Sequence, residues 1–229
     1  RAVFGTCNND PGHGHNYLLD VTVSGEVDQH TGMVVNLFDL KRGLQEVLEE
    51  FDHNHLNLDT PYFKDGIPTT ENIARVLWQR LETQKDIGRL HAIRLSEDED
   101  LFADVTAAAG PDEASVTRRY QFTAVYVGEA ASGGNWNGHT YDLFVTVHGP
   151  IDREIGMVTD IVALDRLVQE KVIQSFNGQD LRTILRVPNV TGEQLVRAIW
   201  DRLVKSVPSG KLDHVRLVQT RDLAFEYTG

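Results

Sequence analysis

The chain has 229 residues, of which 41% are apolar and one is a cysteine. Its formal net charge of −12 argues against a nucleic-acid-binding protein, because phosphate contacts need a basic surface. No apolar run approaches the ~18 residues of a membrane span, and a single cysteine excludes an internal disulfide framework. We therefore expect a cytoplasmic protein with no membrane partner.

The first predicted element is a strand over residues 17–27, where apolar and polar residues alternate. A turn and a short strand ending near Val35 are expected next. Apolar residues then recur at helical spacing from Leu40 to Phe51, which predicts an amphipathic helix.

After a loop over 52–68, a second helix is expected to begin at Thr69 or Thr70, either of which is a natural N-cap. Two strands, near 90–95 and 100–105, should complete the segment. This order of strands, helices and strands predicts an α+β fold, in which helices back one face of an antiparallel sheet.

The chain contains this plan twice. Residues 17–25 resemble residues 141–149 at an offset of 124, and the later elements match at an offset of 122. We therefore assign a first domain to 1–105, a linker rich in small residues to 106–115, and a second domain to 116–229. The second copy begins with an extra strand near 119–127, so a matching strand is expected upstream of Arg1.

Potential chemistry is densest at the start of the chain. His13 and His15 are two residues apart at the entry to a strand, where alternate side chains share a face, and Cys7 is nearby. Imidazoles are good zinc ligands. An isolated His-x-His pair is more often structural, but the sequence Gly-His-Gly-His beside a lone cysteine favours a metal site.

Two further groups permit two interpretations each. Asp52 and His53 could form a carboxylate–imidazole relay, or His53 could merely interact with the dipole at a helix end. Glu71 could be a first-turn helix charge, and Glu97 could simply belong to the acidic run of residues 97–100.

Several motifs in order resemble 6-pyruvoyl-tetrahydropterin synthase across nearly all of residues 1–105. They are Cys-Asn-Asn-x-x-Gly-His-Gly-His-Asn-Tyr from Cys7, Thr-Gly-Met-Val from Thr31, Asp-His from Asp52 and Thr-Thr-Glu-Asn from Thr69. The resemblance implies two tandem tunnelling-fold domains, whose sheets join across subunits of a homo-oligomer into a barrel.

The resemblance also implies the roles of individual residues. His13 and His15 would bind a catalytic Zn²⁺, and the third histidine ligand is expected upstream of Arg1. Cys7 would be the catalytic thiolate, assisted by Asp52 and His53. The substrate-binding residues would be Thr69, Thr70, Glu71 and Glu97, with Glu97 gripping the pterin ring.

The implied reaction converts 7,8-dihydroneopterin triphosphate into 6-pyruvoyl-tetrahydropterin with elimination of triphosphate. One alternative is the sister enzyme that makes 6-carboxytetrahydropterin for the queuosine pathway, although five residues separate Cys7 from His13 here rather than that enzyme's usual three. A second alternative is an inactive module that binds only metal or pterin. A purine-oxidising enzyme of the same fold also has tandem units, but has no need of the Cys and His-x-His motif.

The second copy has lost most of these chemical groups. Asn177 and Gly178 replace the Asp-His pair, and Gln219 replaces Glu97, whereas the apolar faces of its helices are kept. This pattern predicts that the second copy serves assembly and fills positions that identical subunits occupy in single-domain relatives.

Overall fold

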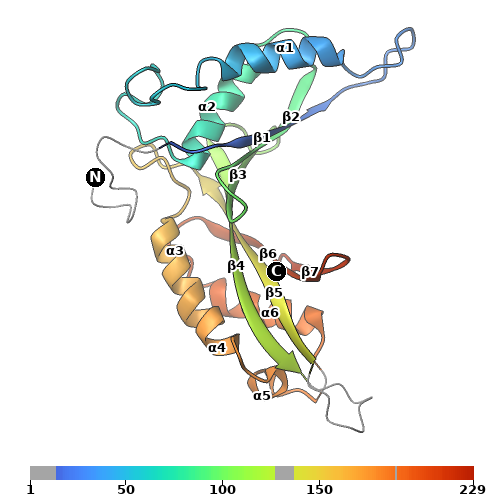
Figure 1. The fold of residues 1–229 in the computed structure, drawn as a ribbon, viewed down its shortest axis with the longest axis vertical. Coiled ribbons are helices and arrows are strands. Elements are labelled where there is room, and N and C mark those ends of the chain that lie inside the picture. Colours follow the sequence, from blue (N-terminus) through green and yellow to red (C-terminus); the bar gives the residue numbers. More distant parts are fainter. Residues whose placement is uncertain (1–13, 127–136, 189) are drawn as a thin grey trace. The chain divides into compact units, whose positions relative to one another are not determined.

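The computed structural model describes residues 14–126, 137–188 and 190–229. Its contacts divide these residues into two compact units (Figure 1). The first unit comprises residues 15–116 together with 149–158, and the second comprises 117–148 and 159–229. A ten-residue segment of the second sequence copy thus belongs to the unit formed by the first copy.

The first unit is an antiparallel sheet with two helices. Strand β1 pairs with β2, and β2 pairs with β3. Helix α2 packs on β2 and β3, and α1 packs on α2. The elements are β1 (Leu18–Ser24), α1 (Leu37–Leu48), α2 (Thr70–Glu82), β2 (Arg89–Ser96) and β3 (Leu101–Thr106).

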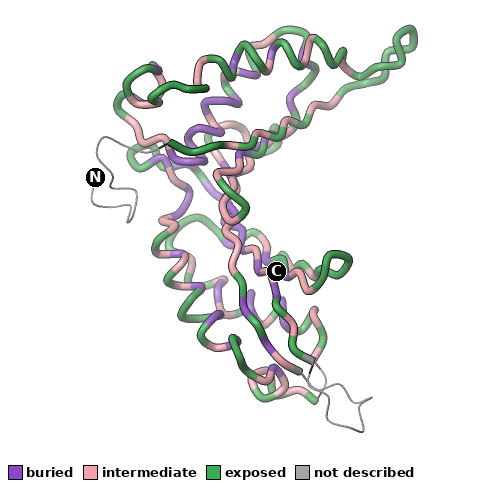
Figure 2. Tube along the Cα trace, viewed as in Figure 1, coloured by how far each residue is buried: buried purple, intermediate pink, exposed green. Residues whose placement is uncertain are grey.

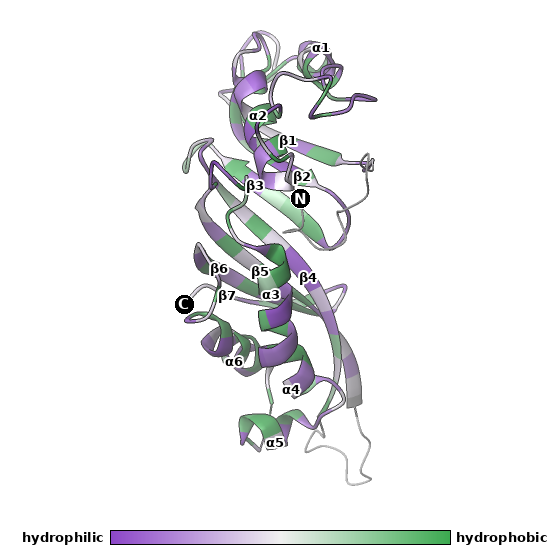
Figure 3. Cartoon of the chain, turned by 90° about the vertical axis from the view of Figure 1, so that its left-hand side faces the viewer, coloured by the Kyte–Doolittle hydropathy of each residue, from purple (hydrophilic) through white to green (hydrophobic). Residues whose placement is uncertain are grey.

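The second unit repeats this plan with an additional first strand, and two of its other strands are longer than their counterparts in the first unit. Its strands are adjacent in chain order, and α6 packs on β6 and β7. The elements are β4 (Glu113–Tyr126), β5 (Asn137–Pro150), α3 (Ile161–Val168), the π-helical turn η1 (Gln169–Ile173), α4 (Gln174–Phe176), α5 (Leu181–Leu185), α6 (Gly192–Leu203), β6 (Lys211–Thr220) and β7 (Leu223–Tyr227). Hydrophilic and hydrophobic bands follow one another along the strands, as expected where one sheet face is buried (Figure 3).

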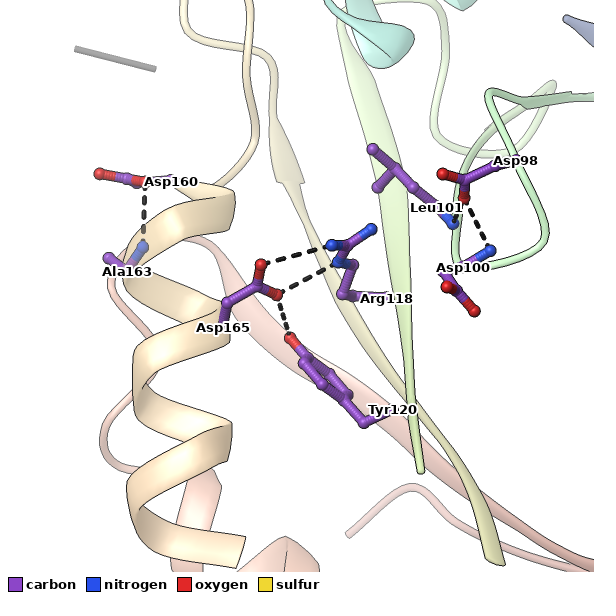
Figure 4. A network of polar contacts seen from close by, with 8 residues as sticks. All are labelled: Asp98, Asp100, Leu101, Arg118, Tyr120, Asp160, Ala163 and Asp165. Carbon is purple, nitrogen blue, oxygen red and sulfur yellow. Dashed lines mark hydrogen bonds and ion pairs between the residues drawn. The ribbon is translucent and has the colours of Figure 1, made fainter. Parts of the chain in front are cut away.

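Local sequence explains where the helices begin. The side chains of Asn36 and Thr69 accept hydrogen bonds from backbone N–H groups in the first turns of α1 and α2, and Asp160 caps α3 in the same way. Figure 2 shows buried residues along α2, whose side chains Leu77 and Leu81 are 2% and 0% exposed. In the second unit, Asp165 of α3 accepts hydrogen bonds from Arg118 and Tyr120 of β4 (Figure 4), and burial raises the pKa of Tyr120.

The duplication is visible in fine detail. The pairing of β1 with β2 shifts register between Thr22 and Val23, and the pairing of β5 with β6 shifts between Thr146 and Val147, 124 residues later. A shared bulge at the same position shows that the two copies have kept their backbone geometry as well as their apolar pattern.

One predicted element is wrong. No strand ends near Val35 in the described residues, where 25–36 form turns and irregular loop instead. The Asp28 carboxylate accepts hydrogen bonds from the backbone N–H groups of His30 and Thr31, which holds a tight turn. The apolar residues after this turn resemble a strand in sequence, but no strand of the described residues pairs with them. No helix in the described ranges is long and apolar enough to span a membrane.

Candidate active site

A loop of the second copy lies against the start of α2. The Thr69 hydroxyl donates a hydrogen bond to the carbonyl oxygen of Gly156, and the Val158 N–H donates one to Glu71 Oε1 over 3.3 Å. Gly156 has φ of +72°, and a Cβ there would lie 2.9 Å from the carbonyl oxygen of Ile67. Only glycine therefore allows so close an approach in this conformation.

This loop buries Glu71, which is 2% exposed. Burial raises the pKa of the Glu71 carboxyl to about 7, since the charged form loses its hydration. The nearby Glu97 carboxylate adds to the rise, whereas the hydrogen bond from Val158 opposes it. Of the predicted substrate-binding residues, Glu71 is thus the one most fully enclosed by protein.

The raised pKa predicts that folding stability falls as the pH rises from about 4.5 to about 7. In that range folded Glu71 keeps a proton that the unfolded chain has released. The unfolded state therefore binds fewer protons, and raising the pH stabilises it relative to the folded state. At pH 8 the free energy of unfolding should be lower than at pH 4 by on the order of 3 kcal/mol because of this group. Glu71→Gln should abolish this difference, giving a variant more stable than wild type at pH 8 in urea denaturation.

Glu193 of α6 is the matched control for this measurement. It occupies the equivalent position in the second copy, is exposed, and has a pKa lowered by hydrogen bonds at the helix start. Glu193→Gln should leave the slope between pH 5 and 8 unchanged. If Glu71→Gln left the wild-type pH dependence intact, the assignment of the raised pKa to the buried Glu71 carboxyl would be refuted.

Glu97 lies at the centre of a second cluster. Its Oε2 accepts a 2.8 Å hydrogen bond from the Thr70 hydroxyl, and its Oε1 is 3.3 Å from His15 Nδ1. The turn after Glu97 is fixed by Asp98, whose carboxylate accepts hydrogen bonds from the N–H groups of Asp100 and Leu101 (Figure 4). A carboxylate has about four lone-pair positions, so Glu97 keeps acceptor capacity for a two-donor ligand edge.

Asp52 and His53 form the predicted pair. His53 Nδ1 is 3.0 Å from Asp52 Oδ2, and both side chains are largely exposed. His53 has φ of +58°, a left-handed conformation that costs a β-carbon-bearing residue about 1–2 kcal/mol. Its counterpart Gly178 has φ of +71° and adopts this conformation without that cost. A histidine kept in a glycine conformation is the kind of strain found at functional sites.

Two of the predicted residues, Cys7 and His13, lie outside the described residues. Among the residues that the structure describes, no group of three or more His, Cys, Asp or Glu side chains is placed to hold a metal. The observable part of the predicted metal site is therefore the ring of His15, which Glu97 orients through Nδ1.

The equivalent site in the second copy is altered by two side chains. Gln219 occupies the position of Glu97, and Phe225 that of Ala103. The Phe225 ring lies so close to Gly192 that a Cβ on residue 192 would be 2.1 Å from its Cε2 atom. The second copy has thus exchanged a carboxylate for an amide and placed an aromatic ring against the start of α6.

Sequence reasoning missed the contribution of Gly156 and Val158. The available signal was the Gly-Met-Val motif, which both copies share at residues 32–34 and 156–158. It was visible as part of the repeat, but nothing local indicated that the second occurrence would contact Thr69 and Glu71.

Comparison with known proteins places this arrangement in a family. The family model described as 6-pyruvoyl tetrahydropterin synthase matches residues 1–108 and again 115–229. A human 6-pyruvoyl tetrahydrobiopterin synthase is 47% identical over 96 residues, which are 42% of this chain and 66% of the human protein. An Archaeoglobus fulgidus protein named putative 6-carboxy-5,6,7,8-tetrahydropterin synthase is 39% identical over 93 residues, 41% of this chain and 74% of that protein.

Among solved structures, that of Caenorhabditis elegans 6-pyruvoyl tetrahydropterin synthase has a TM-score of 0.45 and 24% identity, covering 51% of this chain and 96% of that one. The match with the human relative spans just under two thirds of that protein's length. Because the family model accounts for nearly every residue in two successive matches, the chain belongs to the 6-pyruvoyl tetrahydropterin synthase family and contains two copies of its domain.

Proposed function

We propose that the first copy converts 7,8-dihydroneopterin triphosphate into 6-pyruvoyl-tetrahydropterin and triphosphate. The observation that carries this proposal is the position of Glu97, a partly exposed carboxylate after β2. It accepts a hydrogen bond from Thr70, the first residue of α2, and contacts the ring of His15. The 2-amino group and ring N–H of a pterin form a two-donor edge that suits two carboxylate oxygens. Charge-assisted hydrogen bonds to Glu97 would fix the ring and orient its side chain.

The remaining chemistry is proton transfer without an external oxidant. Both side-chain hydroxyl carbons become carbonyl carbons, while the pterin ring is reduced and triphosphate leaves. We assign Cys7 as the base that accepts a proton from the side-chain carbon next to the ring. Asp52 and His53, which contact each other over 3.0 Å, would receive and return protons. The exposed position of this pair permits exchange with solvent.

The residues present are compatible with a bound Zn²⁺. His13 and His15 would supply two imidazole ligands. The contact of His15 Nδ1 with Glu97 is the arrangement that usually fixes the tautomer of a metal-binding histidine, leaving Nε2 for the metal. When bound, zinc would act as a Lewis acid that makes the substrate's hydroxyl and adjacent C–H protons more acidic.

Zinc content provides a test of this assignment that is independent of turnover. The protein in its full natural length should bind one zinc per chain, measured by plasma mass spectrometry after dialysis. His15→Ala should reduce the zinc content to a small fraction, because a catalytic zinc usually has about three protein ligands and this variant lacks one of them. His139→Ala, at the equivalent position of the second copy, should retain one zinc. Equal retention in both variants would refute the assignment.

We also propose that the domains have the family's tunnelling fold and that the chain forms a homo-oligomer. The antiparallel sheets with helices packed on them, present in both units, support the proposed fold. The second copy, with Gln219 and Phe225 at the altered site, would contribute packing surfaces and no turnover of its own.

The decisive experiment is anaerobic incubation of the zinc-loaded chain with dihydroneopterin triphosphate and identification of products by mass spectrometry. We expect a 6-pyruvoyl product and triphosphate, both lost in Cys7→Ala. A 6-carboxy product with acetaldehyde would replace the proposed reaction with that of the sister enzyme. Absence of any product from zinc-loaded protein would assign the first copy to a binding role.

A further inference from the structure

A polar cluster beyond the end of α1 has no role in the proposed reaction. Glu50 Oε1 accepts hydrogen bonds from Nε and Nη2 of Arg80 on α2, over 3.2 and 2.7 Å. Glu50 Oε2 accepts a hydrogen bond from the Tyr62 hydroxyl. The Arg80 guanidinium also lies over the Tyr62 ring, with 6.0 Å between Cζ and the ring centroid. We call these three side chains the Glu50 cluster.

The two partners of Glu50 belong to firmly held parts of the first unit. Arg80 is on α2, which packs on α1, β2 and β3 (Figure 1). Tyr62 is followed by Phe63, whose side chain is 0% exposed. The Phe63 carbonyl oxygen accepts a 2.7 Å hydrogen bond from the Asn57 side chain, which closes the loop around it. The cluster therefore ties Glu50 to the core of the unit.

The contacts of the cluster continue into the turn that carries the Asp-His pair. Phe51 stacks on Tyr62, with 5.5 Å between the ring centroids and 10° between the ring planes. On the other side of the pair, the Asn54 side chain donates a 3.2 Å hydrogen bond back to the carbonyl oxygen of Glu50. Both flanks of the pair are thus attached, directly or through one residue, to the Glu50 cluster.

His53 itself makes little contribution to holding this turn. Its backbone has φ of +58°, a conformation that a Cβ disfavours, and its side chain is 91% exposed, so little packing compensates. The preceding Asp52 N–H donates a 2.8 Å hydrogen bond to the Leu48 carbonyl oxygen. A strained residue persists only when its surroundings over-determine its conformation, and here the surroundings are the attached flanks.

The second copy supports a link between the carboxylate and the histidine. Ser175 and Gly178 stand at the positions of the glutamate and the histidine. The arginine is kept as Arg202, but it lies over the Phe176 ring, with 4.2 Å between Cζ and the centroid. Gly178 has φ of +71° and adopts this conformation without strain. The copy with a glycine in the turn thus has no carboxylate beside it.

We propose that Glu50 is a positioning residue for His53. By binding Arg80 and Tyr62 it holds the turn in which the histidine keeps its left-handed backbone beside Asp52. What the histidine does in turnover rests on the proposed function, whereas the positioning is a property of the fold. Glu50 touches no reacting atom in this account, and its effect on the reaction is exerted through the histidine.

The kinetic test replaces the carboxylate by an amide. Glu50→Gln should lower kcat by about 10- to 100-fold, because a small displacement of a proton-transferring group has effects of this size. KM should change little, since the proposed pterin anchor Glu97 belongs to a different cluster. Exchanging the partners, with Glu50→Arg and Arg80→Glu in one chain, should restore most of kcat, whereas each single reversal should not.

A second arginine–carboxylate pair of the same unit is the matched control. Asp104 accepts hydrogen bonds from Nε and Nη2 of Arg94 over 2.7 and 3.0 Å. The Arg94 and Asp104 side chains are 47% and 22% exposed, against 37% and 31% for Arg80 and Glu50. Asp104→Asn should therefore lower stability in urea denaturation about as much as Glu50→Gln, and should leave kcat unchanged.

Amide hydrogen exchange, followed by nuclear magnetic resonance, tests the positioning without turnover. The N–H groups of Asp52 and Asn54 donate to backbone carbonyl oxygens within the turn. Their exchange should accelerate in Glu50→Gln while α2 stays protected, and should not change in Asp104→Asn. If zinc-loaded wild type makes no product, the proposed reaction fails and the exchange rates alone decide the positioning. Unchanged exchange in Glu50→Gln, or equal kcat in Glu50→Gln and Asp104→Asn, would overturn the proposal.

Discussion

Replacing Glu97 by Gln is expected to lower kcat/KM for the pterin substrate by about 100-fold or more. The carboxylate accepts from Thr70 and contacts His15 Nδ1, and in the proposed complex it also accepts two hydrogen bonds from the pterin. An amide keeps one acceptor and turns an NH₂ group toward these donors. Hydrogen bonds to charged groups are worth about 1.5–3 kcal/mol each. The amide replaces one of them with a donor–donor contact and leaves the other without its charge, which together predict this magnitude.

The chain supplies its own control for this variant. Gln219 is the equivalent residue of the second copy, and Gln219→Glu should neither create a second active site nor alter the first. The Phe225 ring, packed against Gly192, still occupies space at that position. Steady-state kinetics of both variants would decide the matter. Turnover in Glu97→Gln within a few-fold of wild type would rule out Glu97 as the pterin anchor.

Gly156→Ala, in the second copy, is expected to destabilise the first unit by about 2–5 kcal/mol. The left-handed backbone at φ of +72° costs alanine about 1–2 kcal/mol. The added Cβ would also lie 2.9 Å from the Ile67 carbonyl oxygen, a backbone atom that cannot easily move, and overpacking of this kind adds about 1–3 kcal/mol. A displaced loop would expose Glu71, so kcat/KM should fall as well.

Gly32→Ala separates the two causes, because Gly32 has the same backbone conformation in open space. It should cost only the conformational part, about 1–2 kcal/mol, and leave activity unchanged. Urea denaturation at pH 7 measures the difference, and equal losses for the two glycines would refute the docked loop.

The elements of each copy were largely predictable because their signals are local. Alternation identifies β1, and the Thr-Thr-Glu sequence indicates the start of α2. The sequence left two threonines as candidate N-caps, of which the structure selects Thr69. The wrong strand near Val35 has a physical reason. Apolar residues form a strand only where a partner strand accepts their hydrogen bonds, and a local pattern does not reveal whether a partner exists.

The sequence indicated which residues belong to the site, but it did not indicate the contacts between them. The sequence motif indicated Glu71, but its burial depends on Val158, which is 87 residues away along the chain. The same limit applies to the contact between His15 and Glu97, since two strands and two helices separate these residues in sequence. The left-handed conformation of His53 is different: the glycine that replaces it at position 178 was a visible clue to positive φ.

The central claim is that one copy carries the chemistry and the other copy carries structure. The most direct test is calorimetric titration of the zinc-loaded chain with 7,8-dihydroneopterin, which lacks the triphosphate and so cannot complete the elimination. We predict one bound pterin per chain, lost in Glu97→Gln and kept in Gln219→Glu. Two pterins per chain, or one that survives Glu97→Gln, would contradict the assignment of the site to the first copy.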